Sequence, residues 1–224
     1  MVLAGPGTHA AICVLFICLH LDAAMKLGPL FLVLACSCGS PPLANNPPRN
    51  LTICCFGDSL VRGVGASDHN VTSYPAQLGE ILNTEVTNQG LSGDTSKDGV
   101  DKLSHFNNQQ FGIVIVTLGG NDILRRVNWQ DTKQNLTRIF SELTGTGHFV
   151  VFTGIDVPLT PSRSKRCGQL CEAHGVLYVS NILDGITNNP KLLSDKIHPN
   201  DDGYRLMAER VANALRTAGI FAKL

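Results

Sequence analysis

The sequence predicts an α/β protein with three layers (α/β/α), in which a parallel sheet of about five strands lies between two layers of helices. Two observations support this prediction. Short apolar runs of strand length alternate along the chain with longer segments whose apolar residues recur at helical spacing. The runs are hydrophobic at successive positions, which is typical of parallel strands that are covered on both faces.

The first half of the predicted domain contains three strands and two helices. Residues 51–56 (LTICCF) are a short buried strand that ends at a glycine. The helix that contains 75–82 has a proline in its first turn, where a missing N–H is tolerated. Residues 85–88 form a weaker strand, and 96–106 have a valine and a leucine at helical spacing. Residues 111–118 (FGIVIVTL) are the clearest strand, because they are almost wholly apolar and rich in β-branched residues.

The second half repeats the alternation. Residues 131–143 are a helix, because four apolar residues share one face: Leu136, Ile139, Phe140 and Leu143. Residues 148–155 and 175–180 are apolar strands, and the segment 163–174 between them is predicted to be helical. The last helix is expected over 202–217, since a glycine two residues later is a typical stop signal.

Two apolar runs precede the predicted domain. Residues 10–21 and 27–35 are separated by charged residues, and neither reaches the roughly 20 residues that a bilayer span needs. Each has the length of the apolar region of a signal peptide. The second run follows Met25 and a lysine and ends directly before Cys36. This order is typical of the signal of a bacterial lipoprotein.

The predicted organisation is therefore a leader over 1–36, a proline-rich tether over 37–50 and a single domain over 51–224. Val-Leu-Ala directly before Cys36 forms a lipobox, which makes Cys36 the predicted lipidated first residue and Met25 an alternative start. We expect an exported, periplasmic protein that is anchored to the membrane through Cys36. An ordinary signal peptide and a buried apolar N-terminus are the alternatives.

Composition narrows the possible partners. The chain has 18 basic and 18 acidic residues, which argues against a nucleic acid recognised through net charge. Cys54 and Cys55 lie in an apolar strand, where buried, inert thiols are expected. Cys167 and Cys171 share a face of a predicted helix, but two ligands do not make a metal site. The sequence therefore predicts no metal and no cofactor.

Polar segments follow the predicted strands and precede the last helix. Ser59 follows the first strand, Gly93 lies beyond the second and Asn121 beyond the third, while Asp195 and His198 stand before the last helix. In a parallel sheet the active site lies at the carboxyl ends of the strands. A hydroxyl, an imidazole, a carboxylate and N–H donors at one edge are what a serine hydrolase requires.

These segments carry a family resemblance. FGDSL (56–60), NQGLSGDTS (88–96), LGGND (118–122) and DKIHPN (195–200) resemble, in this order, blocks I, II, III and V of the SGNH (GDSL-type) hydrolases. Within that superfamily the chain is similar to the bacterial thioesterase I, lysophospholipase L1 and arylesterase group. The resemblance covers nearly the whole predicted domain, and it implies a flavodoxin-like sheet.

The resemblance implies a role for each matching residue. Ser59 corresponds to the nucleophile, His198 to the general base and Asp195 to the carboxylate that orients the histidine. The backbone N–H groups of Ser59 and Gly93 and the side-chain amide of Asn121 correspond to the oxyanion hole. Each residue alone has a structural explanation, since Ser59 could cap a helix and Asn121 could serve a turn. Their joint occurrence favours the catalytic interpretation.

Other motifs do not compete with this interpretation. The Gly63-Val-Gly65 pattern resembles the start of a dinucleotide-binding fingerprint, but Asp68 stands where its third glycine belongs. A GxSxG elbow is absent, because Val61 replaces its last glycine.

Three functions remain open at this level. The first is hydrolysis of acyl esters or thioesters, with a small acyl ester or a lipid as substrate. The second is removal of O-acetyl groups from an envelope glycan, and the third is a non-catalytic envelope-binding module. We expect the loops 62–74, 124–130 and 157–166 to set the specificity.

Overall fold

The structure is a computed structural model that describes residues 47–106, 111–156 and 161–222. The predicted leader with Cys36, and the tether up to residue 46, lie outside the described residues. Among the residues that are described, no helix is long and apolar enough to cross a bilayer.

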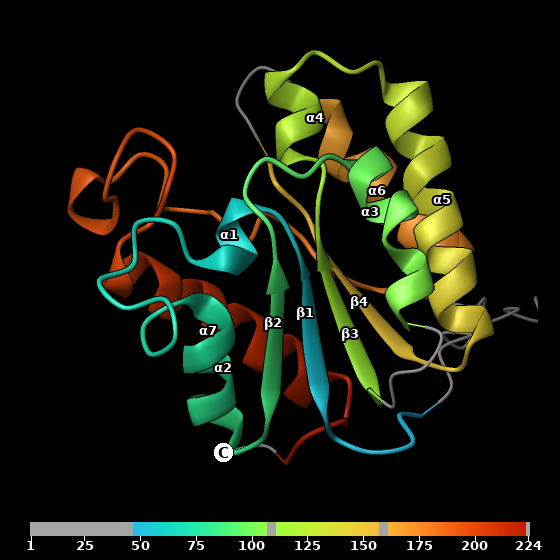
Figure 1. The fold of residues 1–224 in the computed structure, drawn as a ribbon, viewed down its shortest axis with the longest axis horizontal. Coiled ribbons are helices and arrows are strands. Elements are labelled where there is room, and N and C mark those ends of the chain that lie inside the picture. The colour runs from blue at the N-terminus through green and yellow to red at the C-terminus, as the bar shows by residue number, and fades with distance from the viewer. Residues whose placement is uncertain (1–46, 107–110, 157–160, 223–224) are drawn as a thin grey trace, which may run out of the picture. The chain divides into compact units, whose positions relative to one another are not determined.

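Five parallel strands form one sheet (Figure 1). They are β1 (Ile53–Gly57), β2 (Val86–Gly90), β3 (Ile113–Thr117), β4 (Phe149–Thr153) and β5 (Leu177–Val179). Their order is β2-β1-β3-β4-β5, which confirms the predicted flavodoxin-like sheet of five strands. The chain moves from β1 to one edge and then returns past β1 to β3. The switch point of this topology, where α/β proteins bind their ligands, lies between β1 and β3.

Helices cover both faces of the sheet. The helices are α1 (Ser59–Arg62), α2 (Tyr74–Leu82), α3 (Ser96–Asp101), α4 (Gly120–Leu124), α5 (Trp129–Gly145), α6 (Pro161–Ala173) and α7 (Asp201–Thr217), with 3-10 turns at η1 (Leu103–Phe106) and η2 (Pro190–Leu192). Helices α2 and α7 pack on one face, and α5 and α6 pack on the other, where α3 lies beside α5 (Figure 1).

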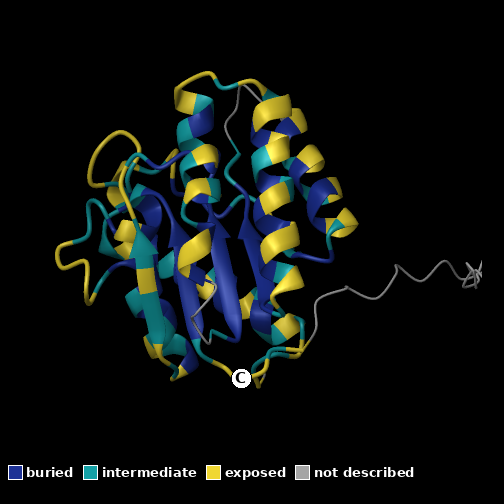
Figure 2. Ribbon diagram, turned by 45° about the vertical axis from the view of Figure 1, so that its right-hand side comes forward, coloured by how far each residue is buried: buried dark blue, intermediate teal, exposed yellow. Residues whose placement is uncertain are grey.

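The centre of the sheet explains why the apolar runs do not alternate. Ile113 and Ile115 face the layer of α2 and α7, whereas Val114 and Val116 face the layer of α5, and all four are fully buried. Burying one such side chain stabilises the fold by about 1.5–3 kcal/mol. The edge strand β2 is only partly covered, as Figure 2 shows, and its sequence signal is correspondingly weak.

One predicted helix is shorter than expected. The predicted helix over 96–106 ends at Asp101 and continues as the 3-10 turn η1. The tighter turn places Leu103 and Phe106 in the core, where each is 3% exposed. Lys102, at the junction, forms an ion pair with Asp94. Tertiary contacts therefore override the helical spacing at this point.

Three short elements were not predicted: α1, α4 and η2. Helices of three to five residues show no periodicity, and their stability comes from caps and packing. In α1, for example, the carboxylate of Asp58 accepts a hydrogen bond of 3.0 Å from the N–H of Leu60. Two of these elements, α1 and α4, directly border the site described next.

Candidate active site

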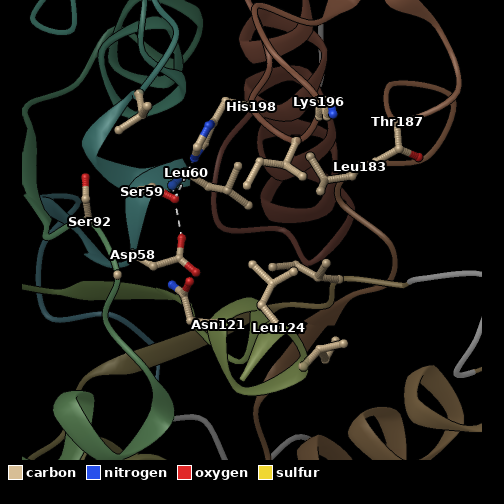
Figure 3. A pocket seen from close by; sticks show the side chains of 16 residues that line it. Asp58, Ser59, Leu60, Ser92, Asn121, Leu124, Leu183, Thr187, Lys196 and His198 are labelled. Carbon is tan, nitrogen blue, oxygen red and sulfur yellow. Dashed lines mark hydrogen bonds between the residues drawn. The ribbon is translucent and has the colours of Figure 1, made fainter. Parts of the chain in front are cut away.

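A pocket of about 320 Å³ opens at the carboxyl edge of the sheet, beside the switch point between β1 and β3 (Figure 3). Ser59, Gly93, Asn121 and His198 all line it. The structure therefore brings together residues from four segments that are distant in the sequence. Asp195, the fifth predicted residue, contacts His198 from behind.

Ser59 stands where β1 turns into α1. Gly57 makes this turn possible, because a Cβ atom at Gly57 would lie only 2.1 Å from the carbonyl oxygen of Thr117 in β3. Asp58 then caps α1, and Ser59 is its first residue. The N–H groups of a first helical turn have no partner within the helix. Both the hydroxyl and the backbone N–H of Ser59 are thus available at the pocket.

Ser59, His198 and Asp195 form one chain of hydrogen bonds. The Nε2 atom of His198 lies 3.0 Å from the Ser59 hydroxyl, and Nδ1 lies 2.7 Å from a carboxylate oxygen of Asp195. The hydrogen bond from His198, together with backbone N–H groups of Ile197 and His198, lowers the pKa of Asp195 to about 2. An ionised carboxylate only accepts hydrogen bonds, so Nδ1 carries the proton. In the neutral imidazole, the lone pair of Nε2 therefore faces the serine hydroxyl.

The loop that carries His198 is held by contacts that the sequence did not reveal. The N–H of Ser194 donates to the carbonyl of His198 at 2.9 Å, and Leu193 and Pro199 form an antiparallel bridge. Gly65 packs against this loop with φ +94, and a Cβ atom there would lie 2.7 Å from the carbonyl oxygen of Pro199. The second glycine of Gly63-Val-Gly65 thus makes room for the histidine loop.

Gly93 and Asn121 meet on the other side of Ser59. Gly93 has φ +90, a conformation that favours glycine. The Nδ2 group of Asn121 donates one hydrogen bond of 2.9 Å to the carbonyl of Asp94. A primary amide has two N–H donors, so the second is left for a ligand in the pocket.

A buried carboxylate joins the segments that carry Gly93 and Asn121. Asp122 is 1% exposed, and it accepts hydrogen bonds from the N–H and hydroxyl of Ser96 and from the hydroxyl of Thr132. Ser96 begins α3, Asp122 belongs to α4 and Thr132 lies in α5. One side chain therefore fixes three helices at the edge of the pocket.

A second carboxyl group lies beneath the serine. Asp58 is 2% exposed and lines the pocket. Burial, with the nearby carboxylates of Asp94 and Asp122, raises the pKa of Asp58 to about 6, although a hydrogen bond from Leu60 and the charge of His198 act in the opposite direction.

The remaining wall of the pocket is mainly apolar, formed by Leu60, Ile123, Leu124, Ile155, Leu183 and Ile197 (Figure 3). Of the loops that were expected to set specificity, 62–74 contributes Val64 and 124–130 contributes Leu124. In the third loop, 157–166, positions 157–160 lie outside the described residues. Leu183 and Thr187, which follow β5, line the pocket without having been predicted.

The described cysteines lie away from this chemistry. Cys54, Cys55, Cys167 and Cys171 are buried free thiols. Burial raises the pKa of Cys55 to about 12 and that of Cys167 to about 11, so both stay protonated and unreactive. Within the described part of the chain, no group of three or more His, Cys, Asp or Glu residues could hold a metal ion.

Comparisons with known proteins agree with this geometry. The model of the GDSL-like lipase/acylhydrolase family matches residues 55–206. The chain is 30% identical over 175 residues to the thioesterase 1/protease 1/lysophospholipase L1 of Escherichia coli K12, which covers 74% of this chain and 83% of that protein. It is 29% identical to an arylesterase of Vibrio mimicus, over 71% of this chain and 86% of the other. The crystal structure of AlinE4, an SGNH-hydrolase family esterase, superposes with a TM-score of 0.58 at 30% identity, over 75% of this chain and 95% of that one.

Proposed function

This chain belongs to the GDSL-like lipase/acylhydrolase family and is a serine hydrolase that acts on ester bonds, and from this premise we propose that it cleaves acyl esters or thioesters through an acyl-enzyme on Ser59. The observation that carries the proposal is the hydrogen-bonded chain from Asp195 through His198 to Ser59, which ends in an apolar pocket.

In the first half of the reaction, the Ser59 oxygen attacks the carbonyl carbon of the substrate while Nε2 of His198 takes the hydroxyl proton. The ionised Asp195 stabilises the resulting imidazolium through Nδ1. The tetrahedral intermediate then collapses, and its bond to the leaving group breaks as His198 returns the proton to the leaving oxygen or sulfur. The acyl group remains bound to Ser59.

In the second half, water takes the place of the serine. His198 removes a proton from a water molecule as the water oxygen attacks the acyl carbon. The bond between that carbon and the Ser59 oxygen then breaks, and His198 returns the proton to the Ser59 oxygen. The products are a carboxylic acid and the enzyme in its starting state. In both halves the negative oxygen accepts hydrogen bonds from the N–H groups of Ser59 and Gly93 and from the amide of Asn121.

The apolar wall favours substrates with a hydrocarbon acyl chain. Apolar side chains from five segments surround the pocket beside Ser59, including Leu124, Ile155 and Leu183. Each buried methylene is worth about 0.8 kcal/mol, which is roughly a fourfold gain in binding. We therefore place acyl esters and thioesters, among them lipid esters, ahead of acetylated sugars.

A series of p-nitrophenyl esters tests this choice of substrate. We expect kcat/KM to rise with chain length by up to about fourfold per methylene until the pocket is filled. Acetylated sugars are tested beside these esters as the alternative class of substrate. Efficient release of acetate from such sugars, with no gain on acyl chains longer than acetate, would instead identify a carbohydrate O-acetylesterase.

Labelling with a fluorophosphonate tests the acyl-enzyme. The wild-type protein should react covalently at Ser59, and Ser59→Ala should lose both the label and at least about 10⁴-fold of the esterase rate. Ser92→Ala is a matched control, because Ser92 lines the same pocket but has no part in the proposed mechanism. Hydrolysis that survives in Ser59→Ala would rule out the proposed nucleophile.

We also propose that the protein is exported and lipidated at Cys36. The support is the sequence alone, in which an apolar run ends in Val-Leu-Ala-Cys and a proline-rich segment follows. Mass spectrometry of the N-terminal peptide from host membranes should find Cys36 acylated, and Cys36→Ser should block processing. Protein recovered from the cytosol, with an unmodified N-terminus upstream of Cys36, would contradict this proposal and leave the hydrolase function unaffected.

A further inference from the structure

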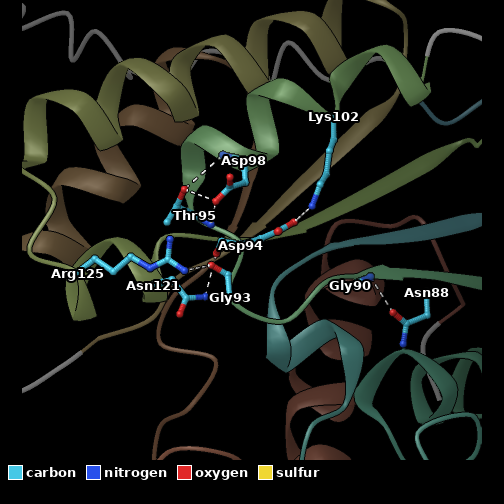
Figure 4. Close-up of polar contacts among 9 residues, drawn as sticks. All are labelled: Asn88, Gly90, Gly93, Asp94, Thr95, Asp98, Lys102, Asn121 and Arg125. Carbon is cyan, nitrogen blue, oxygen red and sulfur yellow. Dashed lines mark hydrogen bonds and ion pairs between the residues drawn. The ribbon is translucent and has the colours of Figure 1, made fainter.

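Two side chains of the α4 turn bind consecutive carbonyl groups of the segment that carries Gly93 (Figure 4). Asn121 donates to the carbonyl of Asp94 at 2.9 Å, and the guanidinium of Arg125 donates to the carbonyl of Gly93 at 2.8 Å. Asn121 and Arg125 are four residues apart, which places them one above the other on a helical turn. The second of these contacts has no part in the mechanism described so far.

The bound segment needs such support. Gly93 adopts φ +90, and the carbonyl of Leu91 receives the N–H of Asp94 across a turn at 3.2 Å. A glycine in a loop has more conformational freedom than any other residue, so the direction of its N–H depends on what holds its neighbouring groups. A positively charged donor forms a stronger hydrogen bond to a carbonyl than a neutral donor does.

A carboxylate near the start of α3 also acts on Arg125. Hydrogen bonds from Thr95 lower the pKa of Asp98, and the positive charges of Lys102 and Arg125 add to this effect. The negative charge of Asp98, near the start of α3, in turn attracts the positive charge of Arg125. This attraction acts on Arg125 in addition to its hydrogen bond with the Gly93 carbonyl.

We propose that Arg125 is a positioning residue of the oxyanion hole, which holds Gly93 so that its N–H points at the oxygen of the tetrahedral intermediate. Arg125 does not touch the substrate in this arrangement, and it acts only through Gly93. The inference rests on the proposed function, since it assigns Arg125 a part in the same reaction. The α4 turn with its C-cap residue would then serve the oxyanion hole twice. Asn121 supplies one N–H donor, and Arg125 orients the N–H of Gly93.

The test compares Arg125→Ala with Arg126→Ala. Arg126 is the adjacent residue, it is exposed as Arg125 is, and its removal changes the surface charge equally. A displacement of a catalytic group by about 1 Å can lower the rate about 100-fold. We expect Arg125→Ala to lower kcat by about 10-fold to 100-fold with KM within about threefold, and Arg126→Ala to change neither.

Two further readouts separate positioning from a structural effect. Millimolar guanidinium ion should restore part of the kcat of Arg125→Ala and leave Arg126→Ala unchanged. The rate of fluorophosphonate labelling should fall in parallel with kcat, because the phosphonyl oxygen occupies the oxyanion hole. Thermal unfolding of both variants should match that of the wild type, since both side chains are exposed.

The outcomes distinguish this inference from the proposed function. An active wild-type protein together with an Arg125→Ala variant of unchanged kcat, or equal losses in both arginine variants, would overturn the positioning role alone. A wild-type protein that neither hydrolyses esters nor reacts with the fluorophosphonate would overturn the proposed function and this inference with it.

Discussion

The two sides of the Ser59 hydroxyl are built in different ways. The base side, residues 194–199, carries Asp195 and His198 on one loop, and Asp195 accepts hydrogen bonds from the backbone of that same loop. The oxyanion side, residues 91–95 with α4, joins two segments that follow different strands. It is assembled by side chains that cross from one segment to the other, among them Asn121, Asp122 and Arg125.

Because of this difference, we expect substitutions on the two sides to have different effects on the protein's stability. The Asp195 side chain is 52% exposed, so the base side can lose a residue with little effect on the core. Asp122, on the oxyanion side, is buried and holds three helices. We therefore expect substitutions on the base side to affect the rate alone. On the oxyanion side, substitutions of Asn121 and Asp122, which are partly or fully buried, should also lower the free energy of unfolding.

The largest effect is expected on the base side. His198→Ala removes the proposed general base, and kcat should fall by at least about 10⁴-fold, because a serine hydroxyl is a poor nucleophile without a base. The midpoint of thermal unfolding should stay close to that of the wild type. Steady-state kinetics and calorimetry on the same preparation measure both quantities. A strongly destabilised variant would contradict the idea that the base side is a local construction.

Asn121→Ala should have the next largest effect. In the proposed mechanism its amide bonds the charged intermediate more strongly than the substrate carbonyl, so kcat should fall by about 10²–10³ while KM changes by only a few-fold. The variant also loses the contact with Asp94, so a modest loss of stability is expected in addition. Normal kcat with a raised KM would mean that Asn121 binds the ground state of the substrate instead.

Asp122→Asn tests the difference between the two sides most directly, because Asp122 has no role in the proposed reaction and is expected to contribute only to stability. The new amide group would face donors from Ser96 and Thr132, and we expect a loss of roughly 2–3 kcal/mol in the free energy of unfolding. Urea denaturation measures this loss. Asp101→Asn is the matched control, since that carboxylate lies in an exposed pair with Lys97 and should contribute less than about 1 kcal/mol. If both substitutions lowered the free energy of unfolding equally, Asp122 would not be the residue that holds the three helices together.

The smallest expected effect is a change of stability with pH, and it comes from Asp58, the buried carboxyl group next to Ser59. Burial raises the pKa of Asp58 from 3.8 to about 6, so the folded protein holds this proton more tightly than the unfolded chain does. The stabilising contribution is therefore fully present below about pH 4 and is lost as the pH rises through about 6. Relative to Asp58→Asn, the wild type should lose roughly 2 kcal/mol between pH 4 and pH 7. Urea denaturation at several pH values measures this difference, and stability curves that run parallel across the range would contradict it.

The sequence alone determined the features that a short stretch of residues encodes. Strands β3 and β4 are apolar up to a final threonine and rich in β-branched residues, so their burial on both faces could be predicted from the sequence without any partner. The base side was readable for the same reason, since one loop contains both Asp195 and His198. The polar residues at successive strand ends predicted the location of the site, because parallel strands end at one edge.

Only the tertiary structure decided the features that depend on contacts between distant segments. The predicted helix over 96–106 divides because Phe106 must reach the core, and α4 is too short to show a period. The sequence does not distinguish Arg125 from other surface arginines. Only the fold places its guanidinium 2.8 Å from the Gly93 carbonyl. Residue type and spacing determine the local structure of a segment. The contacts that a side chain makes with distant segments depend on how the strands and helices pack.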